Sequence, residues 1–175
     1  MDNYPAGHRM ISDLKAWSAE LVFNSSFIPD FGSLNLLQQA ENRFDRYIEL
    51  LEMVEGNEPP EILHTMANSI RMDDDCGAYQ VTIDTFRKFM SWGYLIAFIE
   101  VLAKVNFRRP DLASDLVIVM SQTMLGDNCT FLQAFERELE SSKTSAAGHS
   151  VQVIVQEKRK GTLSYAKPEL KLVAG

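Results

Sequence analysis

The chain of 175 residues lacks most of the features that mark a secreted, membrane-spanning or disulfide-stabilised protein. It has only two cysteines, Cys76 and Cys129, which belong to no CxxC or Cys/His cluster, so the sequence predicts no disulfide and a reducing compartment. No apolar run reaches the roughly 20 residues that cross a bilayer. The first residues include Asp2 and Pro5 in place of a basic and then an apolar stretch, so we expect no secretory signal.

Catalytic and metal-binding patterns are also missing. The three histidines are far apart, and the chain has neither a glycine-rich phosphate loop nor a nucleophile elbow. Three consecutive aspartates begin at Asp73, but an EF-hand would need glycine and glutamate where Ala78 and Asp84 stand. The sequence therefore predicts a protein that is not an enzyme and that holds no metal or cofactor.

Charge is distributed unevenly along the chain. The net charge is −7, yet residues 141–175 carry 6 Lys/Arg against 2 Asp/Glu, whereas residues 1–140 carry 11 against 22. An acidic body repels phosphate backbones, so nucleic-acid binding is not expected, and a basic peptide partner is favoured.

Helical periodicity predicts an all-α fold. Serine, proline, glycine and asparagine punctuate the apolar stripes at the positions where helices begin and end. The helices expected from these signals run over 9–23, from Ser33 to Gly56, from Pro60 to Ile70, from Tyr79 to Met90, from Ser91 to Val105, from Leu112 to Gly126 and from Thr130 to Leu139. The last begins with a capping box, in which Thr130 and Gln133 each satisfy an amide at the helix start.

The stretch from Phe86 to Val105 is the most apolar part of the chain, and its apolar residues lie on every face of a helix. Such a helix has to be surrounded by other elements, so we expect it at the centre of a bundle, with a join near Met90 and Ser91. The small residues Ser91 and Gly93 near its start leave room for another backbone to approach.

The composition changes after residue 140. Serine, threonine, alanine and glycine dominate up to residue 150, and residues 151–155 alternate weakly in the manner of a strand. We interpret residues 1–140 as one helical domain and residues 141–175 as a basic, flexible C-terminal tail. The alternative is an ordered extension that packs on the bundle or on another copy of the chain.

Two amphipathic helices, the second and the fourth, direct aromatic and aliphatic side chains toward the start of the central helix. A groove there would hold an amphipathic helix of a partner protein. The residues expected to line this groove are Phe44, Tyr47, Ile48, Leu51, Val81, Thr85, Ser91, Gly93, Tyr94, Ala97 and Val101. The alternative is that the apolar members are ordinary core residues, and the spacing alone identifies no partner.

Three short segments resemble motifs of the Bcl-2 family. Ser91-Trp92-Gly93-Tyr94-Leu95-Ile96-Ala97-Phe98 resembles the first homology motif, usually Asn-Trp-Gly-Arg followed by an apolar pair and Ala-Phe. Leu37-Gln38-Gln39-Ala40-Glu41-Asn42-Arg43-Phe44 is similar to the third motif, and Phe131-Leu132-Gln133-Ala134-Phe135 to the end of the second, without its double glycine. Together the similarity extends over residues 9–140.

The resemblance implies a bundle of about eight helices around a buried central helical hairpin. It also implies a surface groove that takes the Bcl-2 homology 3 helix of a pro-apoptotic, Bim-like protein. Binding would sequester that helix and inhibit apoptosis. A compact chain without a membrane anchor is typical of a viral member, which would act in the host cytoplasm and reach mitochondria only through its partners.

Two positions depart from the family pattern. Tyr94 stands where the family has the arginine that pairs with the aspartate of the bound helix, so the phenol would donate one neutral hydrogen bond in place of a charge-assisted pair. We expect a weaker contact and a narrow set of partners. Glu41 replaces the glycine of the third motif, so the chain is not expected to serve as a death ligand itself.

Other functions remain as alternatives to the inhibitor. A pore-forming, pro-apoptotic relative of the same fold would carry an intact third motif and a membrane anchor. A general helical adaptor without a ligand groove needs neither. A homodimer is a further alternative, and the sequence does not identify the preferred ligand.

Overall fold

The computed structural model describes residues 11–26, 34–71, 78–141, 148 and 151–157. Nearly all of them are helical, which confirms the all-α prediction. The elements in chain order are α1 (Leu14–Asn24), α2 (Leu34–Glu52), α3 (Glu61–Ser69), α4 (Ala78–Lys88), the 3-10 helix η1 (Trp92–Tyr94), α5 (Leu95–Arg108), α6 (Pro110–Gln122), β1 (Met124–Gly126), β2 (Cys129–Thr130) and α7 (Phe131–Ser141). Residues 151–157 form one more helical segment.

Local sequence signals place most helix ends close to where they were expected. α1 starts later than predicted, after Asp13, whose carboxylate accepts a hydrogen bond from the amide of Ala16 at 3.0 Å. Pro110 occupies the first turn of α6. The capping box of α7 is confirmed, because the Thr130 amide donates to Gln133 Oε1 at 2.9 Å and the Gln133 amide donates to Thr130 Oγ1 at 3.2 Å.

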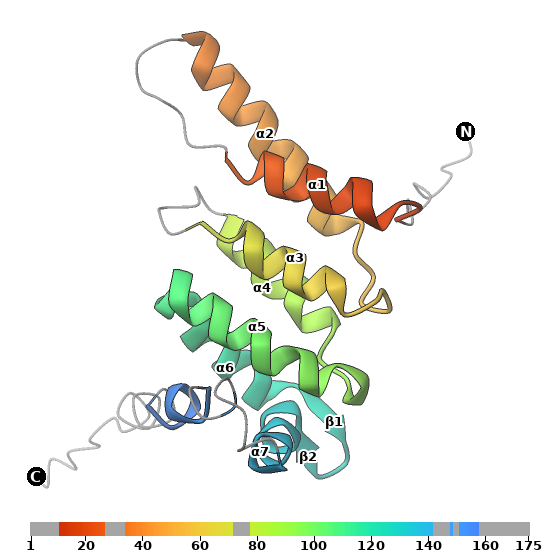
Figure 1. Ribbon diagram of the computed structural model, residues 1–175, viewed down its shortest axis with the longest axis vertical. Helices are drawn as coiled ribbons and strands as arrows, with labels where there is room; N and C mark the ends of the chain where they lie inside the picture. The colour runs from red at the N-terminus through yellow and green to blue at the C-terminus, as the bar shows by residue number, and fades with distance from the viewer. Residues whose placement is uncertain (1–10, 27–33, 72–77, 142–147, 149–150, 158–175) are drawn as a thin grey trace, which may run out of the picture.

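The helices form two rows that run the length of the molecule (Figure 1). In one row α1 packs on α3, α3 on α5 and α5 on α7, and in the other α2 packs on α4 and α4 on α6. The rows are joined where α1 packs on α2, α5 on α6 and α6 on α7, whereas α3 and α4 have little contact with each other. The helices therefore lie in successive layers, α1 with α2, α3 with α4 and α5 with α6, and each layer contacts mainly the layers before and after it; we call this arrangement the stack of helix pairs.

α5 has one buried face and one exposed face. Its buried residues are Leu95, Phe98, Ile99, Val101, Leu102 and Val105. On the other side, Ile96 is 70% exposed and Phe107 is 79% exposed. The prediction that this helix is surrounded on every side is wrong, because its contacts with α3, α6 and α7 leave the side of Ile96 and Phe107 open.

A sharp bend separates α4 from α5, close to the predicted join at Met90 and Ser91. α4 ends at Lys88, and its axis makes an angle of 106° with the segment formed by η1 and α5. The Ser91 amide donates to the Phe89 carbonyl at 2.7 Å inside the turn. The bend carries the chain from the second row of helices into the first.

The C-terminal part of the chain differs from the sequence prediction in two ways. A short antiparallel hairpin of β1 and β2 follows α6, where a helix was expected to reach Gly126. Residues 151–157 are helical, and Val151 and Val155 are buried in the core, so this segment is not the flexible tail that was predicted and does not form the strand that its alternation suggested. Val151 and Val155 are four residues apart, a spacing that places them on one face of a helix and that also fits an alternating strand. The alternative of an ordered extension therefore describes this part of the tail, while residues 158–175 lie outside the described residues.

Candidate functional site at the turn before α5

The turn between α4 and α5 exposes large apolar side chains around an open stretch of backbone. Trp92 is 57% exposed, and Ile96, four residues later, is 70% exposed. Gly93 lies between them, and a Cβ at this position would meet no atom within 4 Å. No close packing within the described chain requires this glycine, so a partner has free access to the backbone here. We call the surface of Trp92, Gly93 and Ile96 the apolar corner.

The loop between α2 and α3 is held against the apolar corner, and both lie at one edge of the molecule (Figure 1). The Tyr94 hydroxyl donates to the Glu58 carbonyl at 2.7 Å, and its ring packs edge-to-face on Phe89 with ring centres 5.1 Å apart. The Lys88 ammonium donates to the Val54 carbonyl at 2.6 Å. These contacts fix the position of the loop beside the turn.

Tyr94 has a different role from the one predicted. Burial, and then the negative charge of Glu58, raise the pKa of the Tyr94 phenol, so it stays protonated. Its single proton is donated to the Glu58 carbonyl and is not available to an aspartate of a ligand. In the structure this side chain anchors the α2–α3 loop.

The predicted groove residues fall into three groups. Ser91 and Gly93 are exposed. The members that are partly buried and packed against the core are Phe44, Ile48, Val81, Tyr94 and Ala97. The members that are buried in the core are Tyr47, Leu51, Thr85 and Val101. These four are not open to a ligand, which corrects their place in an open groove floor: α2 packs on α4, so the stripes expected to line a groove contact each other.

One small cavity lies beside α2 and α4 in the described part of the chain. The Tyr47 hydroxyl and Ser69 Oγ lie 3.1 Å apart, beside a cavity of about 10 Å³, which has room for about one water molecule. A larger hollow of about 240 Å³ lies between α7 and residues 151–157. It is lined by Glu136, Leu139, Glu140, Gln152, Val155 and Gln156. Neither space includes a residue of the predicted groove other than Tyr47.

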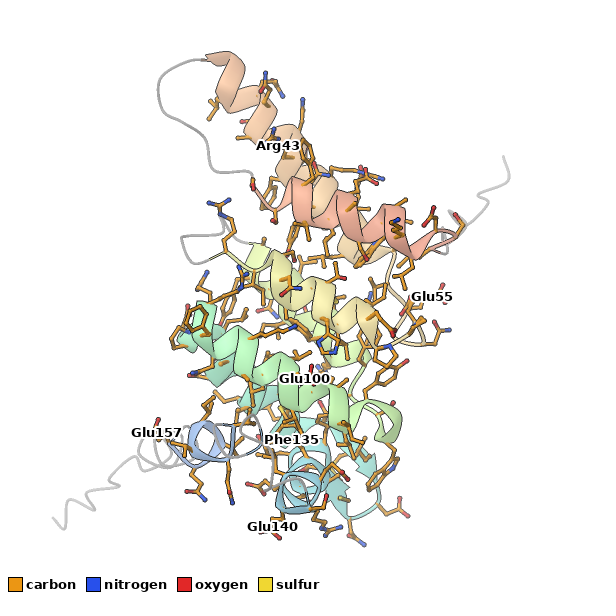
Figure 2. The ribbon with its side chains drawn as sticks, viewed as in Figure 1. Arg43, Glu55, Glu100, Phe135, Glu140 and Glu157 are labelled. Carbon is orange, nitrogen blue, oxygen red and sulfur yellow. The ribbon has the colours of Figure 1, made fainter. Side chains whose placement is uncertain are left out.

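Acidic residues outnumber basic ones in the two stretches of chain that meet at Tyr94. Residues 52–61 contain four glutamates and residues 89–103 contain one, Glu100, and neither stretch contains lysine or arginine. The Glu58 carboxylate accepts hydrogen bonds from two amides of its own loop, at 2.7 and 2.8 Å. Figure 2 shows Glu55 on this loop and Glu100 on α5. The corner therefore has an apolar centre and a negative rim.

The described residues contain no cluster typical of a catalytic or metal site. His64 Nε2 lies 3.8 Å from Glu100 Oε2, and no nucleophilic side chain is recorded against this pair. Within the ranges that the structure describes, no group of three His, Cys, Asp or Glu side chains could hold a metal ion. The aspartates that begin at Asp73 lie outside those ranges.

Two parts of the apolar corner and its rim were missed by the sequence reasoning. Ile96 follows Trp92 by four residues, a spacing that indicates one shared helix face. The apolar residues on every side of this helix nevertheless predicted that Ile96 would be buried. The glutamates of residues 52–61 carried a signal in the absence of any lysine or arginine among them. Their position beside the turn depends on the Tyr94 contact, which no local pattern reveals.

Comparison of the chain with protein-family models, with curated proteins and with solved structures finds no match in any of the three. In the described part of the chain, no single helix is long and apolar enough to cross a membrane. α4 and the segment Trp92–Arg108 reach that length and apolarity only together, across the 106° bend.

Proposed function

We propose that the protein binds an amphipathic helix of a partner protein at the apolar corner, and that it inhibits apoptosis by sequestering a pro-apoptotic helix there. The proposal is carried by the two large apolar side chains, Trp92 and Ile96, which are exposed four residues apart with an unobstructed glycine between them. An amphipathic ligand helix presents apolar anchors about one turn apart, and such anchors can cover two neighbouring exposed side chains.

The buried side chains of the same turn hold the site in a fixed conformation. Leu95 and Phe98 point into the core while Trp92 and Ile96 face outward, so packing fixes the backbone that presents the exposed side chains. A binding surface held by packed residues loses little conformational entropy when a ligand arrives. Covering Trp92 and Ile96 would contribute up to about 2 kcal/mol each.

The identity of the ligand rests on the sequence motif rather than on the arrangement of the helices. The residues of the apolar corner belong to the segment that resembles the first Bcl-2 homology motif. That motif supports a Bcl-2 homology 3 helix as the partner. With Tyr94 engaged by Glu58, apolar burial would supply most of the binding energy.

Calorimetric titration with a panel of Bcl-2 homology 3 peptides tests the proposal. We expect at least one peptide to bind, and the double variant Trp92→Ala, Ile96→Ala to weaken it roughly tenfold or more, because buried apolar anchors dominate such interfaces. Phe107→Ala is the matched control, since Phe107 is equally exposed at the other end of α5. Unchanged affinity in the double variant, or no binding of any peptide by the wild type, would reject the proposal.

A helical scaffold is the second candidate, and it is favoured by the stacking of helix pairs in two rows. Stacks of this kind present extended surfaces to protein partners. A scaffold needs no pocket for a single death-motif helix. The same titration separates the two functions, because a scaffold would give no binding heat with any peptide of the panel.

A further inference from the structure

We propose that the apolar corner selects a helix that carries basic side chains beside its apolar anchors. This inference rests on the proposed function and adds the charge of the ligand to it. Its basis is the negative rim, which the α2–α3 loop and α5 build on two sides of the corner.

The first side of the rim comes from the α2–α3 loop. The Tyr94 hydroxyl donates to the Glu58 carbonyl of this loop at 2.7 Å, and Tyr94 follows Trp92 by two residues in the same turn. The loop carries Glu55 and Glu58, and the exposed Glu61 follows in the first turn of α3. None of these three carboxylates forms an ion pair with another described residue, although the Lys88 ammonium is bonded to the Val54 carbonyl of the same loop.

The second side of the rim comes from α5. Glu100 follows Ile96 by four residues, so the two side chains lie on one face of the helix. The Glu100 carboxylate is 3.8 Å from His64, and its side chain is 63% exposed. Lys104 lies one further turn along and is partly buried. The carboxylate thus remains open to solvent beside the exposed isoleucine.

The basic residues near the apolar corner do not make its net charge positive. The ammonium of Lys88 is bonded to the Val54 carbonyl and supplies one positive charge, against four glutamates in residues 52–61. Arg87 precedes it on α4. An acidic residue of a ligand over Trp92 would face the glutamates of the rim with no arginine to receive it, since Tyr94 stands at that position. Like charges placed across an interface disfavour a partner, so the rim acts by excluding acidic helices as well as by attracting basic ones.

Two synthetic amphipathic peptides of about 20 residues, long enough for several helical turns, test the inference. They share one apolar face and differ only in the flanking polar positions, which are lysine in one peptide and glutamate in the other. We expect the lysine peptide to bind the full-length protein roughly tenfold more tightly at low salt, because each exposed ion pair contributes a small factor. The difference should shrink near 1 M salt, where the screening length is about 3 Å.

Variants that replace carboxylates by amides test whether the rim causes the preference for the lysine peptide. Glu61→Gln combined with Glu100→Gln should bring the two peptides to similar affinity, whereas the control Glu41→Gln with Asp45→Asn, exposed on α2, should leave the preference unchanged. Equal or tighter binding of the glutamate peptide would overturn the charge preference and leave helix binding intact. A preference that survives in the rim variant would overturn the assignment to these residues. Binding of neither peptide would reject both this inference and the proposed function.

Discussion

Replacement of Phe98 by alanine tests the packing that holds the apolar corner in place. Phe98 is 1% exposed and packs edge-to-face on Phe86 of α4 and on Phe131 of α7, with ring centres 6.3 and 5.0 Å apart. Phe131 in turn stacks on Phe135 at 6.4 Å. One side chain of α5 therefore connects helices from three successive layers of the stack.

The expected loss of stability follows from these contacts. Removing a fully buried phenylalanine costs about 3–5 kcal/mol. Each edge-to-face aromatic pair adds about 0.5–1.5 kcal/mol beyond the buried area, and Phe98 makes two. We expect Phe98→Ala to lose about 4–5 kcal/mol, in the upper half of the range for a buried phenylalanine, because both ring pairs are lost. A domain of ordinary stability, about 5–15 kcal/mol, would stay folded but unfold at a clearly lower denaturant concentration.

Urea unfolding followed by circular dichroism measures this loss, and an unchanged m-value would show that the folded state remains compact. Phe107→Ala is the control on the same helix; it is 79% exposed and should lose less than about 0.5 kcal/mol. A loss below about 1 kcal/mol for Phe98→Ala, or equal losses for the two variants, would refute the assignment of the buried face of α5.

Three further predictions concern single contacts. Gly56 has a φ of 93° and lies so close to the Lys88 backbone that a Cβ would overlap it, so Gly56→Ala should lose about 1–3 kcal/mol of stability, and a neutral result would contradict this. Tyr94→Phe removes the bond to the Glu58 carbonyl and should cost about 1 kcal/mol and speed amide exchange in residues 54–60; unchanged exchange would show that the bond does not hold the loop. Hydrogen bonds from Arg46 lower the pKa of the Glu20 carboxyl below its ordinary value of 4.5. These bonds therefore stabilise the folded state fully above pH 4.5, and the stabilisation is lost as the pH falls through the lowered pKa. Unfolding at pH 7 and pH 3 should therefore show Glu20→Gln less stable than wild type only at the higher pH, by under about 1 kcal/mol because both side chains are partly exposed; a loss that persists at pH 3 would point to another cause.

Helix starts and breaks were predictable because the groups that define them are close in sequence. The capping box of Thr130 and Gln133 spans three residues, and Pro110 acts at its own position. The break after Lys88 was also visible, since Ser91 and Gly93 interrupt an otherwise continuous apolar stripe. Hydrogen bonds between near neighbours leave a pattern in the sequence that can be read without the fold.

The partners of the apolar faces were not predictable in the same way. Periodicity shows which side of α2 and α4 is apolar, but not that the two sides pack on each other and bury Tyr47 and Thr85. The bond from Tyr94 to Glu58 joins residues 36 positions apart. Contacts at such separations depend on the path of the whole chain, so the rim of the apolar corner could be described only with the fold in hand.

The stack of helix pairs has a consequence for how the molecule opens. Because each pair is supported mainly by its neighbours, opening can begin at an end of the stack and stop part-way. α1 and α2, supported from one side only, should exchange their amide protons sooner than α5. The apolar corner lies on the inner layer, so it would keep its shape through partial unfolding that has already released the first pair, and the protein would hold its ligand in states that are no longer fully native.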